Sequence, residues 1–132
     1  MPFYSTADEL YAVLQDVFEE VKKHPEHIET FASSNLVLRL RFSRPEAEVL
    51  LDGRPPPLEV FYGERPGDAN LELAMDGDLL HRIWLGQTAL KDAFFGGQIR
   101  TKGNVLRAMK LNDLFREAER AYPQVLESRG LL

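Results

Sequence analysis

The stretch FFGGQIRTKGN, Phe94 to Asn104, is the most informative segment of this chain. The glycine pair Gly96-Gly97 favours the end of a helix, because glycine readily adopts the left-handed backbone conformation that closes one. Gln98 to Lys102 alternates its side chains with the period of two that predicts a strand. Asn104 is a preferred N-cap and predicts that a further helix starts there. A helix, a strand and a second helix are therefore expected in close succession.

The apolar residues of the chain gather on both sides of this stretch. A helix capped by Asp76 or Asp78 is expected to end at Gly86, and the next helix is expected to start at Thr88. After Pro123 we expect one last helical turn. From patterning alone the apolar side chains form an ordinary core more often than the wall of a cavity, and both interpretations stay open. These apolar residues are Leu80, Ile83, Trp84, Phe94, Phe95, Ile99, Leu106, Met109, Leu114 and Phe115.

The first half of the chain predicts one long helix followed by four strands. Thr6 and Glu9 form a capping box, and apolar residues then recur with helical spacing up to His24. Pro25 ends that helix and starts a short one. We interpret the four alternating segments, 36–42, 47–51, 58–62 and 71–75, as a meander of hairpins. On their solvent face we expect attraction between Arg39, Arg41, Glu48, Glu59 and Glu72.

Length and composition limit the function. At 132 residues the chain is expected to form a single domain, residues 1–132, with one hydrophobic core. The net charge of −5 argues against a nucleic-acid partner, because phosphate binding requires clustered Lys and Arg. The absence of cysteine excludes disulfides, thiolate nucleophiles and cysteine-ligated metals. Neither a signal-peptide pattern nor a long apolar run is present, so a cytoplasmic location is expected.

Other candidate sites have simpler explanations. His24 and His27, with Glu20 and Glu26 nearby, could ligate a metal, but Pro25 interrupts the helical spacing and surface histidines are more frequent. An acid–base role for the Asp76 and Asp78 pair competes with helix capping, which the position favours. A G-x-S-x-G nucleophile elbow is absent, and the proline-rich segment 54–58 suits a stiff connection as well as a polyproline ligand. We expect no catalytic residue, metal or cofactor.

The opening stretch closely resembles the sterol carrier protein 2 family, in particular its stand-alone prokaryotic-type members. The family pattern F-x-x-G-[KQ]-[LI]-x-[IVT]-x-G-[ND] matches residues 94–104, and A-x-[KR]-L matches residues 108–111. The acidic-capped helix at residues 76–80 and the glycine at position 86 also fit the family. The last five residues, SRGLL, differ from the S-K-L-like signal of peroxisomal members, so a peroxisomal location is not supported.

The resemblance implies an α+β fold: a five-stranded sheet covered on one face by about five helices, with an apolar tunnel between sheet and helices. It implies a non-catalytic protein that binds and transfers a fatty acid, an acyl chain or a sterol- or isoprenoid-like lipid. Transient contact with a membrane or an enzyme is a further expectation, and the oligomeric state is open. The expected lining residues are Leu80, Ile83, Trp84, Phe94, Phe95, Ile99, Leu106, Met109 and Phe115.

Two other functions stay open. One is an accessory module that presents a lipid substrate to a biosynthetic enzyme, and the other is a small lipid-ester hydrolase, for which no base–nucleophile pair emerges. The cost of an empty cavity bears on the tunnel. At about 24 cal/mol per Å³, an empty tunnel of about 300 Å³ would cost about 7 kcal/mol, comparable to the stability of a whole domain. We therefore expect that lipid fills the tunnel or that helices close over it.

Overall fold

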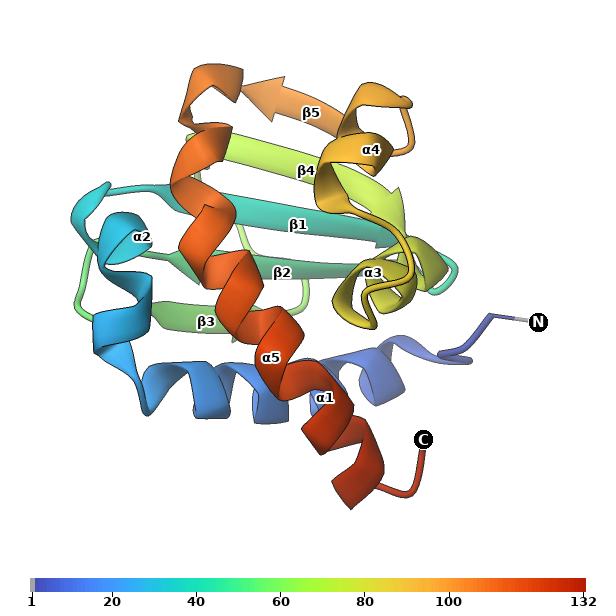
Figure 1. Cartoon of the computed structure of the whole chain (residues 1–132). Helices are drawn as coiled ribbons and strands as arrows, with labels where there is room; N and C mark the ends of the chain where they lie inside the picture. The colour runs from blue at the N-terminus through green and yellow to red at the C-terminus, as the bar shows by residue number, and fades with distance from the viewer. Residues whose placement is uncertain (1) are drawn as a thin grey trace.

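The computed structural model describes residues 2–132 as a five-stranded sheet with its helices on one face (Figure 1). This confirms the predicted α+β class. The elements in chain order are α1 (Ala7–Lys22), the 3₁₀ helix η1 (Pro25–Ile28), α2 (Glu29–Ser33), β1 (Val37–Ser43), β2 (Ala47–Asp52), β3 (Glu59–Tyr62), β4 (Leu71–Asp76), α3 (Gly77–Trp84), α4 (Leu90–Phe95), β5 (Arg100–Gly103), the 3₁₀ helix η2 (Val105–Leu111) and α5 (Asn112–Ser128).

The strands do not form the predicted meander. Hairpins join β1 to β2 and β2 to β3, but β4 leaves β3 and pairs with β1 in parallel, with Leu38 opposite Leu71. The sheet order is therefore β3-β2-β1-β4-β5. The prediction was wrong because period-two alternation gives the face that a side chain occupies and carries no information about which strand lies beside it.

The connection from β3 to β4 is fixed at the face of the sheet that the helices leave open. Arg39 Nη2 donates hydrogen bonds of 3.0 Å to the carbonyl oxygens of both Arg65 and Gly67. The Arg65 guanidinium also lies 3.7 Å from the centre of the Phe61 ring, a cation–π contact. Arg39 thus stabilises the crossing that brings β4 next to β1.

Ion pairs on the open face join neighbouring strands. Arg41 Nη1 lies 3.0 Å from Glu72 Oε1 and Arg41 Nε 3.4 Å from Glu48 Oε1, while Arg39 Nε lies 3.7 Å from Glu48 Oε1. These contacts confirm most of the expected charge pattern. Glu59 is the exception, because its register partner is Asp52 near the β3 edge.

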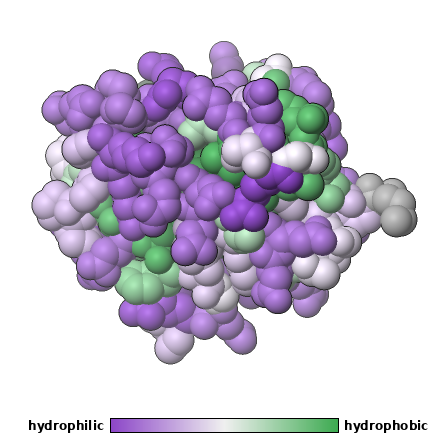
Figure 2. All heavy atoms as spheres, turned by 90° about the horizontal axis from the view of Figure 1, so that it is seen from below, coloured by the Kyte–Doolittle hydropathy of each residue, from purple (hydrophilic) through white to green (hydrophobic). Residues whose placement is uncertain are grey.

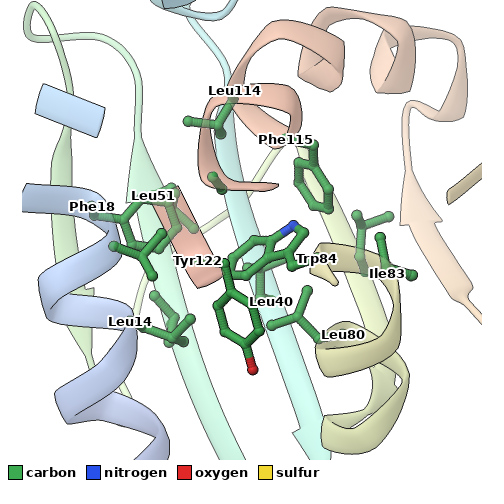
Figure 3. Packing of buried hydrophobic residues seen from close by; sticks show 14 of the residues in the cluster. Leu14, Phe18, Leu40, Leu51, Leu80, Ile83, Trp84, Leu114, Phe115 and Tyr122 are labelled. Carbon is green, nitrogen blue, oxygen red and sulfur yellow. The ribbon is translucent and has the colours of Figure 1, made fainter. Parts of the chain in front are cut away.

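The helical face encloses the core. In α1 the apolar residues repeat with helical spacing, and the Thr6 hydroxyl accepts a hydrogen bond from the Glu9 amide, as the capping-box pattern predicts. Residues Leu10, Val13, Leu14, Val17, Phe18 and Val21 of α1 are buried. Helix α5 crosses α1 on the same side of the sheet (Figure 1). Between them and the sheet the core residues pack in direct contact, as Figure 3 shows.

The structure of residues 88–104 differs from the prediction at three points. Helix α4 begins at Leu90 after the N-cap Ala89, so Thr88 does not cap it, and its C-cap is Gly96 as expected. Strand β5 starts at Arg100, two residues later than predicted. The Asn104 side chain does cap a helix, accepting from the Leu106 amide at 3.2 Å, but that helix is the 3₁₀ helix η2. Because η2 buries only Leu111, packing does not impose α geometry on it.

Helix α5 continues through Pro123 and ends at Ser128, five residues later, close to the last helical turn that was predicted there; the proline lies inside the helix. A proline inside a helix removes one backbone hydrogen bond and costs about 3 kcal/mol. Tyr122, Val125 and Leu126 flank the proline and are all buried, and burial of such side chains contributes about 1.5–3 kcal/mol each. Core packing therefore outweighs the local preference of proline.

Candidate functional site

Trp84, the last residue of α3, lies at the centre of an aromatic cluster beneath α5. Its ring centre lies 5.4 Å from that of Tyr122, 6.0 Å from that of Phe115 and 6.3 Å from that of Phe18, each pair with steeply inclined rings. Figure 3 shows Trp84 between Phe115 and Tyr122, with Leu80 beside it. Such edge-to-face contacts add about 0.5–1.5 kcal/mol per pair beyond simple burial. Three helices are thus joined at one residue.

A pocket of about 420 Å³ opens from this cluster to the surface. It lies between α3, the connection to α4, and the first turns of α5. Ile83, Trp84, Leu90 and Phe115 give it apolar walls. The other lining residues are Gly86, Thr88, Ala89, Lys91, Asn112, Arg116 and Glu119, so polar and charged groups share the lining with the apolar walls. Small-molecule sites combine apolar walls with polar groups that fix the orientation of the ligand.

The indole nitrogen of Trp84 is the unusual group of this site. Within residues 2–132 the Trp84 Nε1 atom is buried and has no hydrogen-bond partner. A buried donor without an acceptor costs about 1–3 kcal/mol, so such groups are rare in folded proteins. In Figure 3 the nitrogen lies on the side of the ring that faces Phe115, which also lines the pocket. An acceptor atom of a bound molecule could satisfy it.

The nine predicted lining residues divide into three groups. Ile83, Trp84 and Phe115 line the pocket. Leu80 and Ile99 are buried in the core, and Phe94 is half-buried with its ring centre 5.8 Å from that of Phe95. The structure places the remaining three on the surface: Phe95 is 77% exposed, Leu106 85% and Met109 75%. These three lie at the end of α4 and in η2, elements in which the buried residues are Ala93 and Leu111 respectively.

Sequence reasoning missed a second polar element next to Trp84. The hydroxyl of Tyr122 lies 2.6 Å from the hydroxyl of Tyr4 and 2.6 Å from His81 Nδ1. The ring of Phe3 stacks on His81 at 3.7 Å between centres. Tyr122 follows Phe115 by seven positions on the apolar face of α5, so helical spacing could have identified it. No periodic signal marks Phe3 and Tyr4.

Burial changes the acid–base behaviour of this hydrogen-bonded chain. It raises the pKa of Tyr4 to about 12 and raises the pKa of Tyr122 further still. Burial also lowers the pKa of His81, although Asp78 nearby acts in the opposite direction. All three groups are therefore uncharged at neutral pH, which suits a region that adjoins an apolar core.

The histidines considered as metal ligands lie at the start of η1. His24, Glu26 and His27 offer ligand atoms within 4.8 Å of one another. His27 Nδ1 lies 3.1 Å from the buried Glu117 Oε2, which also accepts a 2.9 Å hydrogen bond from Arg120. The Arg120 hydrogen bond lowers the pKa of Glu117. These contacts connect the turn after α1 to α5 through His27.

The comparisons with known proteins agree with this fold. Residues 15–116 match the SCP-2 sterol transfer family. The chain is similar to the apo sterol carrier protein 2 of Yarrowia lipolytica, with a TM-score of 0.62 and 19% identity over 83% of this chain and 89% of that one. For sterol carrier protein domain 2 of Helicoverpa armigera the values are 0.62 and 19%, over 81% and 87%.

A third structure, the UbiJ-SCP2 ubiquinone synthesis protein, gives a TM-score of 0.54 and 17% identity over 75% of this chain and 76% of that one. The search of curated protein sequences gave no match. In residues 2–132 no helix is both long and apolar enough to cross a bilayer. The family match covers most of the chain and includes Trp84, Phe115 and the stretch from which the fold was predicted. The chain therefore belongs to the SCP-2 sterol transfer family.

Proposed function

We propose that this chain is a non-catalytic, cytoplasmic lipid carrier that binds a fatty acid, an acyl chain or a sterol- or isoprenoid-like molecule beside Trp84. The observation that carries the proposal is the unpartnered Trp84 Nε1 next to a pocket with apolar walls. A lipid with one oxygen acceptor would satisfy that donor and place its hydrocarbon against Ile83 and Phe115. The family match supports lipid binding as the general class of function.

The pocket must enlarge to take a long chain, because the core behind it is closed. Each methylene that leaves water contributes about 0.8 kcal/mol, so a dozen or more can drive an opening that separates packed side chains. The weakest cover is the segment from α4 to η2. Helix α4 buries only Ala93 and η2 only Leu111, whereas α5 buries eight residues. We propose that this segment moves while α5 stays in place.

The chain contains one tryptophan, so its fluorescence reports on the site directly. Titration with oleic acid should change the Trp84 emission, and native mass spectrometry should show one added oleate. The matched ligand is octadecene, which has the hydrocarbon without the oxygen acceptor. Trp84→Phe keeps an aromatic ring but removes the N–H together with the tryptophan emission, so its binding is followed by native mass spectrometry. It should weaken oleate binding about fivefold, the effect of one hydrogen bond, and leave octadecene binding unchanged.

Tyr62→Phe is the control, because it removes a hydroxyl from a half-buried ring on β3, at the opposite edge of the sheet from β5. It should leave the binding of both ligands unchanged. Unaltered emission and an unaltered mass with fatty acids, sterols and isoprenoid alcohols alike would overturn the proposal.

A second candidate is the accessory module that presents a lipid to a biosynthetic enzyme. The likeness to the UbiJ-SCP2 ubiquinone synthesis protein supports the idea that this fold also occurs in lipid biosynthesis. Co-purification separates the two candidates. A carrier should bind lipid alone, whereas a presenting module should recover one enzyme in fixed stoichiometry.

A further inference from the structure

The exposed apolar side chains of this protein are concentrated around one strand. Phe95 precedes β5, and Val105, Leu106 and Met109 follow it. In the rest of the described chain, residues 2–132, the large exposed apolar residues are Leu131 and Leu132. Strand β5 is an edge strand of the sheet, with α4 near one of its ends and η2 at the other (Figure 1). We name residues 90–111 on this side of the molecule the β5 edge.

Charge is distributed just as unevenly. Residues 90–111 carry five of the 16 Lys and Arg of the chain but only one of its 21 Asp and Glu. Lys91, Arg100, Lys102 and Lys110 are exposed, and within residues 2–132 none of these four forms an ion pair. The remainder of the chain is strongly acidic. The β5 edge is thus a positively charged surface on a negatively charged protein.

We infer that the β5 edge docks on the surface of a lipid bilayer that contains anionic lipids. Exposed Lys and Arg bind the lipid phosphates, and the apolar side chains at the two ends of β5 enter the region between head groups and acyl chains. The acidic remainder of the protein is repelled by the same surface, which leaves one docking orientation. The face viewed in Figure 2, seen from the side opposite β5, is covered mainly by hydrophilic residues.

A bilayer explains both features of the edge together. Nucleic acid would use the cations but would leave Leu106 and Met109 without a partner. The inference rests on the proposed function, because the segment proposed to move during lipid uptake, α4 to η2, is the same segment that would touch the membrane. A carrier docked in this way could open toward its source of lipid without exposing its core to water.

Vesicle sedimentation tests the inference. Vesicles of phosphatidylcholine and phosphatidylglycerol in equal parts should bind the protein at low salt, and vesicles of phosphatidylcholine alone should bind it far less. Lys110→Gln should weaken binding about fivefold, and the triple variant Lys91→Gln, Lys102→Gln, Lys110→Gln about 100-fold, since each cation near an anionic surface contributes about a factor of five. Leu106→Ser and Met109→Ser should each weaken it about tenfold.

Matched controls come from residues outside the β5 edge. Lys23, in a surface pair with Glu20, is 63% exposed at its side chain, and Leu132 is 68% exposed. Lys23→Gln and Leu132→Ser should leave vesicle binding unchanged. Every variant alters an exposed side chain, so thermal unfolding should match that of the parent protein and exclude misfolding as the cause.

Oleate binding in solution, measured by Trp84 emission, separates the two proposals. If the Lys, Leu106 and Met109 variants lose vesicle binding but retain oleate binding, the result supports the β5 edge as the docking surface. Equal binding to neutral and anionic vesicles, or equal effects of the control variants, overturns the inference even if oleate binds. Vesicle binding without binding of any fatty acid, sterol or isoprenoid alcohol overturns the proposed function instead. The membrane inference is also overturned if the parent protein binds no vesicles but forms a stable complex with another protein that the triple variant abolishes. The β5 edge would then be a protein-binding surface.

Discussion

The hydroxyl oxygens of Tyr4 and Tyr122 lie 2.6 Å apart although 118 positions separate them in the chain. Tyr122 also contacts the Trp84 ring and hydrogen-bonds His81. The start of the chain is therefore fixed against α3 and α5, the two helices that enclose the candidate lipid pocket. Stability and ligand binding share these residues.

Tyr122→Phe should lower the free energy of unfolding by about 1–3 kcal/mol, because it leaves the buried Tyr4 hydroxyl without its partner. The measurement is urea denaturation. In the double variant Tyr4→Phe, Tyr122→Phe both hydroxyls are absent, so the loss should be smaller than the sum of the two single losses. Additive losses would show that the hydrogen bond does not couple the two residues.

The free energy of unfolding should depend on pH through His81. Its pKa is lowered in the folded protein by burial, so the unfolded chain binds a proton at higher pH than the folded one. Stability should therefore fall as pH decreases below the ordinary histidine value of about 6.5, and His81 should contribute nothing to the slope above about pH 8. Asp78 opposes this shift and Arg82 adds to it.

The control for that prediction is His81→Phe, which retains an aromatic ring against Phe3 and does not titrate. Its unfolding free energy should change less between about pH 7 and about pH 5 than that of the parent protein. Identical slopes for the two proteins would contradict the assignment to His81.

Gly103→Ala should destabilise the protein more than Gly97→Ala. Both glycines have positive φ, +104° and +78°, so both substitutions strain the backbone by about 1 kcal/mol or more. A methyl group at Gly103 would also collide with the carbonyl of Asn70, whereas at Gly97 it would meet no atom within 4 Å. Thermal unfolding of the two variants, compared at one pH, gives the difference. Equal losses would exclude the steric contribution.

Trp84→Ala and Met109→Ala should separate core from surface. Trp84 is almost fully buried, so its replacement should cost about 3–5 kcal/mol of unfolding free energy. Met109 is 75% exposed, and its replacement should change stability by no more than about 0.5 kcal/mol. Chemical denaturation measures both. A large loss with Met109→Ala would mean that η2 is packed in solution.

Hydrogen exchange should reveal the proposed moving segment. Amides of α4 and η2 should exchange before those in the middle of α5, since the two short helices bury one residue each. Adding oleate should change exchange in residues 90–111 more than in α5. Exchange of α5 first would show that the long helix is the part that opens.

The fold was predictable where local patterning controls it. Neighbouring residues in the sequence are enough to predict the Thr6 cap, the helical spacing of α1 and the alternation in β1. The strand that pairs with β4 could not be predicted, because Leu71, Leu73 and Met75 suit any strand with one buried face. The crossing depends instead on tertiary contacts such as those of Arg39 with residues 65 and 67.

The site was predictable in part for the same reason. Ile83, Trp84 and Phe115 lie on strongly periodic helices and do meet at the pocket. Leu106 and Met109 were expected to line the tunnel because of the family resemblance, and a seven-residue 3₁₀ helix keeps them on the surface. The unpartnered Trp84 nitrogen had no signal in the sequence, since it depends on atoms that only the folded chain brings near.

The parallel pairing of β1 with β4 bears on how this protein is made. Leu38 in β1 cannot pair until Leu71 in β4 has been synthesised. Until then one edge of β1 has unpaired backbone groups, and any extended apolar segment can pair with it. On a ribosome that adds about 5–20 residues per second, this edge stays unpaired for several seconds after β1 leaves the tunnel. A nascent chain stalled between β3 and β4 should therefore bind chaperones, and one extended past β5 should be released.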